Sequence, residues 1–295
     1  MAALDWGRDG ADWPNRAASR FVHAGHLRWH VQTLGTGPPL LLLHGTGAST
    51  HSWRDLAPLL ARRFTVIAPD LPGHGFSERP AQREMSLNGM AAALHALLTT
   101  LNAAPKLVVG HSAGAALAVR MTLDGRIAPA HLIGLNAALL PLAGVLRMMS
   151  PLAKLLSLTG AVPRWVSSRA ADEASVERLI AGTGSVLDAR GAQLYARLMR
   201  DPAHVAGALA MMANWNLDAL FADLPRLTTP LSLFVGSNDR TVPPEQARRV
   251  AERVRDARTH ALADLGHLAH EEDPKLVAGL IWRAHCASRP PVNPP

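Results

Sequence analysis

The sequence predicts an α/β domain with a mostly parallel central sheet, flanking helices and a helical cap. Three observations lead to this prediction. Short apolar runs alternate with helical patterns over much of the 295-residue chain, as expected where helices connect parallel strands. A Gly-x-Ser-x-Gly motif, from Gly110 to Gly114, lies between such a run and a helical pattern. From about Leu139 to Leu220 no convincing strand interrupts the helical pattern, which indicates an insertion into the sheet.

The expected strands are short apolar runs bounded by turn residues. In chain order they are 27–33, 40–43, 65–68, 107–109, 132–135, 231–235 and 259–262. The expected helices follow or connect these runs: 53–60, 87–101, 113–123, 244–254 and 274–286. Pro244 and Pro274 open the last two, and proline suits the first turn of a helix.

The insertion, 139–220, is expected to form a helical cap over the carboxyl edge of the sheet, where open α/β sheets place their active sites. Residues 1–138 and 221–288 form the predicted core, and the proline-rich tail, 289–295, is expected to be disordered. Apolar and flexible side chains are frequent in the cap, and methionine surfaces adapt to large ligands. The candidate substrate pocket consists of Met148, Met149, Trp165, Met211, Met212 and Trp215. The alternative is that these side chains are ordinary cap core.

Ser112, at the centre of the Gly-x-Ser-x-Gly motif, is the candidate nucleophile. A tight turn between strand and helix holds such a serine above the sheet in a strained conformation. The glycines on either side let the two elements approach without a Cβ clash. The dipole of the following helix favours negative charge at this point.

A serine hydroxyl needs a base, and the usual base is a histidine oriented by a carboxylate. Asp239 follows the strand 231–235, and His267 follows the last expected strand, so both belong at the edge where Ser112 lies. His270 and Asp264 are the rivals. Gly266 favours His267 because it permits a tight loop, and Asp264 lies too close to His267 in sequence to reach it easily.

The oxyanion that forms during acyl transfer needs backbone N–H donors. Ala113, at the start of the helix, is one expected donor. The other is Thr46, with Gly47 as the second choice, in the loop that begins with His44 and Gly45. A plain glycine turn would explain the glycines but not His44, whose ring is expected to brace this loop.

No cofactor is expected. The run from Asp70 to Ser77 is interpreted as a turn, because it lacks the lysine and spacing of a phosphate-binding loop. Neither a metal-ligand cluster nor a dinucleotide-binding motif is visible in the sequence.

The chain carries a net charge of +7 and a single cysteine, Cys286. A basic surface can contact nucleic acid, anionic membranes or acidic ligands. The charges are scattered, which argues against nucleic acid but leaves peripheral membrane contact open. One cysteine cannot form an internal disulfide, and neither a signal peptide nor a transmembrane run is visible, so a cytoplasmic location is expected.

These motifs resemble the α/β-hydrolase superfamily along nearly the whole chain, which implies a cap inserted after the sixth strand. The markers are His44-Gly45, Asp70 to Gly75, Gly110 to Gly114, Gly236 to Asp239 and Gly266-His267. Serine at position 112 distinguishes the chain from haloalkane dehalogenases and epoxide hydrolases, which attack through a carboxylate.

A narrower resemblance is to the magnesium-chelatase accessory (BchO) family of bacteriochlorophyll biosynthesis. It is carried by Asp12 to Arg16, Leu27 to Val31, Leu43 to Trp53, Gly182 to Ser185, Val205 to Met212 and Gly266 to Glu272. The resemblance implies a role in the magnesium-porphyrin branch of photosynthetic pigment synthesis, but it supplies no reaction. A porphyrin ester is a candidate for the apolar substrate, and magnesium-chelatase subunits are candidate partners.

Three functions therefore compete. The first is a serine hydrolase acting on an ester of a large apolar molecule. The second is a non-catalytic tetrapyrrole-binding or chelatase accessory protein. The third is a generic esterase or cofactor-free perhydrolase. A complete triad indicates a capacity for hydrolysis, but it does not identify a substrate.

Overall fold

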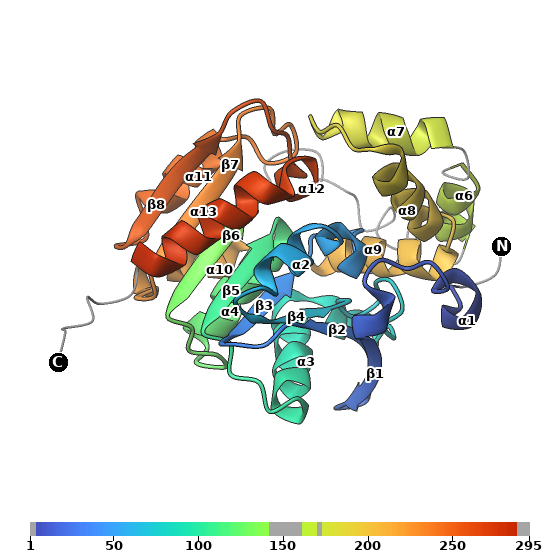
Figure 1. The fold of residues 1–295 in the computed structure, drawn as a ribbon, viewed down its shortest axis with the longest axis horizontal. Helices are drawn as coiled ribbons and strands as arrows, with labels where there is room; N and C mark the ends of the chain where they lie inside the picture. The colour runs from blue at the N-terminus through green and yellow to red at the C-terminus, as the bar shows by residue number, and fades with distance from the viewer. Residues whose placement is uncertain (1–3, 142–160, 170–172, 288–295) are drawn as a thin grey trace.

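A computed structural model describes residues 4–141, 161–169 and 173–287 (Figure 1). Its strands are β1 (Ser19–Ala24), β2 (Leu27–Leu34), β3 (Pro39–Leu43), β4 (Thr65–Pro69), β5 (Leu107–His111), β6 (His131–Leu135), β7 (Leu231–Gly236) and β8 (Ala257–Leu262). They form one eight-stranded sheet in the order β1-β2-β4-β3-β5-β6-β7-β8. Pairing is antiparallel for β1 with β2 and for β2 with β4, and parallel elsewhere. The predicted mostly parallel sheet is confirmed.

The core helices are α2 (Leu56–Leu60), α3 (Leu87–Thr100), α4 (Ala113–Leu123), α10 (Asp218–Asp223), α11 (Glu245–Ala251), α12 (Ala269–Glu272) and α13 (Pro274–Ala287). Short helical turns are α1 (Trp6–Asp9), η1 (Arg16–Ala18), η2 (Thr50–Trp53), η3 (Gln82–Met85) and η4 (Leu224–Arg226). The single helix expected at 53–60 is thus two elements, η2 and α2.

The expected strands omit β1. Its sequence, Ser-Arg-Phe-Val-His-Ala, has little apolar alternation, and five of its six residues are at most half-buried. Within the described sheet, β1 pairs only with β2, across the turn at Gly25, and is therefore an edge strand. Because an edge strand is less buried, its sequence shows little apolar alternation.

Alternate residues of the central strands pack on opposite faces of the sheet. Leu41 and Leu43 belong to a cluster with α3 and α4, whereas Leu40 and Leu42 belong to a cluster with α2 and α13. Both faces are covered, as expected for parallel strands that read as continuous apolar runs.

The insertion between β6 and β7 includes α6 (Ala161–Arg169), α7 (Glu173–Gly182), α8 (Ala189–Met199) and α9 (Pro202–Asn214). These helices gather beyond one end of the sheet in Figure 1. The predicted division into core and cap stays a prediction, and the tail 289–295 lies outside the described residues. Within the described residues, no helix combines the length and the apolar character needed to cross a bilayer.

Asp70, which follows β4, holds two loops in place from a fully buried position. Its Oδ1 accepts from Thr50 N (2.6 Å), and its Oδ2 accepts from Phe76 N (2.9 Å) and pairs with His30 Nδ1 (2.8 Å). Burial opposes ionisation, but His30 and the converging donors outweigh it and keep the pKa of Asp70 below its ordinary value.

We expect Asp70→Asn to lower the free energy of unfolding by about 2 kcal/mol at pH 7, because an amide cannot accept from all three donors. A depressed carboxyl pKa contributes stability above the ordinary pKa and loses it on acidification. Urea unfolding should therefore show the difference from wild type shrinking below about pH 4. The exposed Asp218→Asn is the matched control, and a difference independent of pH would contradict this account.

Candidate active site

Ser112 lies in the strained turn between β5 and α4, with φ 51° and ψ −117°. A Cβ on Gly110 would lie 2.5 Å from Ala115 Cα, and one on Gly114 would overlap the carbonyl oxygen of Leu43. The two glycines therefore allow the strand and the helix to meet closely enough to hold Ser112 in this conformation. Its side chain is only partly buried at the carboxyl edge of the sheet.

Asp239 and His267 form a buried pair at the same edge. Asp239 follows β7, His267 follows β8, and His267 Nδ1 lies 2.8 Å from Asp239 Oδ2. An ionised carboxylate only accepts hydrogen bonds, so Nδ1 carries the donated proton and Nε2 is left as the basic nitrogen. This is the tautomer that a general base requires.

His270 and Asp264, the alternative candidates for the base and the acid, do not take part in the Asp239–His267 pair. The ring of His270 is buried against Trp53 and His111, with ring centroids 4.6 and 4.5 Å away. Asp264 occupies an exposed turn with φ 61°, where its backbone N–H donates to Ser237 Oγ (2.9 Å). The geometry brings together Asp239 and His267, as the sequence indicated.

Three further donors hold the carboxylate of Asp239. Its Oδ2 accepts from Asn136 Nδ2 (2.6 Å), and its Oδ1 accepts from the backbone N–H groups of Thr241 (2.8 Å) and Val242 (2.9 Å). Asn136 follows β6 with φ 48° and also donates to Gly266 O (3.3 Å). Asn136 was not predicted from the sequence, where its only signal is its position directly after a strand.

His111, next to the candidate nucleophile, is a second supporting residue that was not predicted from the sequence. Its Nε2 donates to His267 O (2.9 Å), and its ring lies between those of His267 and His270. Burial, reinforced by the two neighbouring rings, lowers the pKa of His111 well below its ordinary value. His111 is therefore neutral and supports the His267 loop from within the core.

The loop after β3 lies against Ser112, because a Cβ on Gly45 would be 3.1 Å from Ser112 Cβ. His44 braces this loop: its Nδ1 donates to Gly45 O (2.8 Å), and its Nε2 accepts from Leu71 N (2.8 Å). Burial lowers the pKa of His44 to about 3, which keeps the ring neutral for both bonds. The loop that holds Thr46 and Gly47 is thus fixed beside the candidate nucleophile.

The candidate pocket residues occupy different environments. Met211 is fully buried, and its sulfur accepts from Thr46 Oγ1 (3.5 Å), so it lies at the predicted oxyanion loop. Trp215 is partly buried against the main core cluster. Trp165 and Met212 are 59% and 45% exposed. Met148 and Met149 lie outside the described residues.

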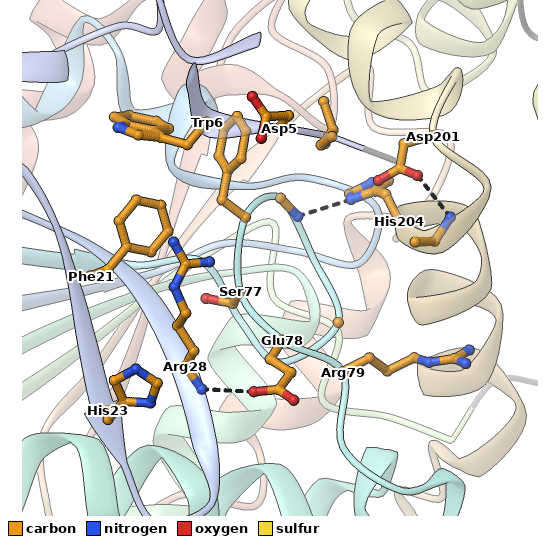
Figure 2. Close-up of a pocket in the computed structure, with 15 residues that line it drawn as sticks. Asp5, Trp6, Phe21, His23, Arg28, Ser77, Glu78, Arg79, Asp201 and His204 are labelled. Atoms are coloured by element: carbon orange, nitrogen blue, oxygen red, sulfur yellow. Dashed lines mark hydrogen bonds between the residues drawn. The ribbon is translucent and has the colours of Figure 1, made fainter. Parts of the chain in front are cut away.

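A cavity of about 540 Å³ lies between β1, β2, the 73–79 loop and the start of α9. Figure 2 draws the residues that line it. Trp6 and Phe21 line one side and His204 the other, and Ser112, Asp239 and His267 are not among its lining residues. His204 Nε2 donates to Gly47 O (3.1 Å), so this residue connects the cavity wall to the loop after β3.

Among the described residues, no three His, Cys, Asp or Glu side chains lie together in a group that could hold a metal ion.

The strand order, the serine turn and the Asp–His pair are those of an α/β hydrolase. Residues 38–274 match the family model described as the alpha/beta hydrolase fold, and the chain belongs to this family. It is 40% identical to a magnesium-chelatase 30 kDa subunit from Rhodobacter capsulatus, over 92% of this chain and 95% of that one. Both resemblances that the motifs indicated are confirmed.

Solved structures of α/β hydrolases have a similar fold. An alpha/beta hydrolase fold protein from Burkholderia ambifaria superposes with a TM-score of 0.77 at 26% identity, covering 90% of this chain and 97% of that one. The epoxide hydrolase CorEH superposes with a TM-score of 0.76 at 25% identity, covering 92% and 99%.

Proposed function

We propose that this chain is a serine hydrolase that cleaves a carboxylic ester, with Ser112, His267 and Asp239 as its catalytic triad. The observation that carries the proposal is the buried Asp239–His267 pair, which lies at the same sheet edge as the strained Ser112. Serine at this position favours acyl transfer over attack by a carboxylate.

In the proposed reaction, Ser112 Oγ attacks the ester carbonyl carbon while His267 Nε2 takes its proton. The backbone N–H groups of Thr46 and Ala113, with Gly47 as the alternative to Thr46, receive the negative charge on the carbonyl oxygen. His267 then protonates the departing alcohol as the carbon–oxygen bond breaks. Water, deprotonated by His267, hydrolyses the acyl-serine and releases the acid.

The proposed substrate is a large apolar ester, such as a porphyrin ester, held under a cap formed by residues 139–220. Met211 supports this proposal because it brings an apolar, adaptable side chain from the insertion to the loop of Thr46. The similarity to a magnesium-chelatase subunit supports the porphyrin class and chelatase subunits as partners. Contact of the basic surface with an anionic membrane stays a prediction.

The second candidate function is a tetrapyrrole-binding or magnesium-chelatase accessory protein that does not use the triad. The name of the similar Rhodobacter capsulatus protein favours it. A generic esterase or perhydrolase is a third candidate, which the same triad would serve.

Labelling of purified protein with a fluorophosphonate, followed by peptide mapping, tests the proposal. Attack by an activated Ser112 on phosphorus expels fluoride and leaves a stable phosphonyl-serine. We expect labelling at Ser112 that is lost in Ser112→Ala and His267→Ala and retained in the exposed control His260→Ala. Folded wild-type protein that stays unlabelled would overturn the proposal, and porphyrin titration would then test the binding function.

A further inference from the structure

A short segment of the insertion, residues 183–186 between α7 and α8, connects the two loops that carry Asp239 and His267. Arg240 N, adjacent to Asp239, donates to Thr183 O (3.1 Å). Leu268 N, adjacent to His267, donates to Ser185 Oγ (2.8 Å). Figure 1 shows the α7–α8 connection approaching α12, which begins directly after this loop.

Close packing fixes the segment between the two loops. Gly184 has φ +84°, and a Cβ there would overlap the carbonyl oxygen of Asn238, next to Asp239. A Cβ on Gly266, next to His267, would overlap the backbone of Gly184. Both loops therefore touch Gly184 through backbone atoms, and no side chain fits between them.

Two further contacts join the segment to the His267 loop. The carboxylate of Glu272 accepts from Val186 N (3.2 Å) and from Gly266 N (2.8 Å), so it bridges the insertion and the loop. Leu268 packs into an apolar cluster whose other buried members come from α7 and α8: Val176, Ile180, Ala192 and Ala196. Residues on both sides of His267 are thus held by the insertion.

Ser185 is the polar side chain at the centre of this arrangement. It is 2% exposed, and its hydroxyl receives the backbone N–H of the residue that follows His267. Without the hydroxyl, that buried N–H would lose its partner, and the His267 loop would lose its polar attachment on the insertion side.

We propose that Ser185 and Gly184 are positioning residues that align His267 with Asp239, so that the insertion completes the catalytic geometry as well as covering it. This inference rests on the proposed hydrolase function. Positioning matters because displacement of the catalytic base by about 1 Å can slow the reaction a hundredfold. A movement of the α7–α8 hairpin would therefore be transmitted to the base.

The decisive experiment measures the second-order rate constant of fluorophosphonate labelling against pH for wild type and Ser185→Ala. We expect Ser185→Ala to label about 10-fold more slowly. The shape of its pH profile should also differ from that of wild type, because a looser His267 is oriented less well by Asp239. Ser185→Thr, which restores a hydroxyl, should recover part of the rate. A residue important only for stability would change the thermal midpoint but neither the pH profile nor the labelling of the folded protein.

Two glycines give a matched pair. Gly184→Ala should slow labelling about 100-fold, whereas Gly182→Ala should not, because a Cβ on Gly182 meets no atom within 4 Å. If wild type labels and Ser185→Ala labels at the same rate with the same pH profile, the positioning role is overturned and the hydrolase stands. If folded wild type does not label, both are overturned.

Discussion

Asparagine in place of Asp239 is expected to lower kcat for ester hydrolysis about 10⁴-fold while the protein remains folded. The carboxylate accepts from His267 Nδ1 and thereby leaves Nε2 free to take the proton of Ser112. An asparagine amide would donate to Nδ1 instead. His267 would then carry its proton on Nε2, the nitrogen that must act as the base.

The fold should survive because asparagine can still satisfy its neighbours. Its Oδ1 can accept from the backbone N–H groups of Thr241 and Val242. Its amide would then face Asn136, whose own Oδ1 is buried and has no hydrogen-bond partner among the described residues. Rotation of the Asn136 amide would present that oxygen as an acceptor. The substitution therefore changes the tautomer of His267 and leaves the packing around residue 239 unchanged.

The measurement is steady-state hydrolysis of p-nitrophenyl acetate, with circular dichroism to establish folding. Asp264→Asn is the matched control, because Asp264 is exposed and asparagine tolerates its positive φ. We expect wild-type kcat in this control. Normal hydrolysis by Asp239→Asn would exclude Asp239 as the residue that orients the base.

Strand ends explain why Ser112, Asp239 and His267 could be predicted together. Each follows a parallel strand, and parallel strands bring their carboxyl ends to one edge, so the order of elements alone indicates their proximity. Helices and strands with strong apolar periodicity were also predictable, because burial of one face determines the pattern of apolar residues along them.

The supporting residues could not be predicted in this way. Asn136, His111 and Ser185 reach their partners across 103, 156 and 83 residues of sequence. Their bonds are to a buried carboxylate and to backbone groups whose positions only the folded chain defines. A single asparagine, histidine or serine at the end of a strand, or in the loop after a strand or helix, carries no local pattern that distinguishes such a role.

Arg54→Met is expected to lower the free energy of unfolding by about 4 kcal/mol at pH 8 and by clearly less at pH 6. Arg54 Nη1 donates to Glu271 Oε2, and Tyr195 OH donates to Glu271 Oε1 (2.7 Å), so the network joins the core to α8. Arg54 Nη2 also lies 3.3 Å from Asp188 Oδ1, at the start of α8. Methionine would preserve much of the stem packing but leave a buried carboxylate without its cation.

The pH dependence follows from the titration of Glu271. Burial raises its pKa from the ordinary 4.5 to about 7, against the opposing effects of Arg54 and Tyr195. The folded state thus holds this proton more tightly than the unfolded state, and stability from this group falls as pH rises from 4.5 to about 7. Removal of Arg54 raises the pKa further and extends that loss to higher pH. At pH 6 Glu271 is protonated in the variant, and no buried charge remains unpaired.

Urea unfolding at pH 6 and pH 8 measures the effect. Adding Glu271→Gln to Arg54→Met should recover most of the stability at pH 8, because the neutral amide needs no cation. The exposed pair of Arg226 with Asp223 gives the control: Arg226→Met should change the free energy of unfolding by less than about 0.5 kcal/mol at either pH. An equal loss for Arg54→Met at both pH values would mean that packing of the arginine stem, and not the charge of Glu271, accounts for the stability it contributes.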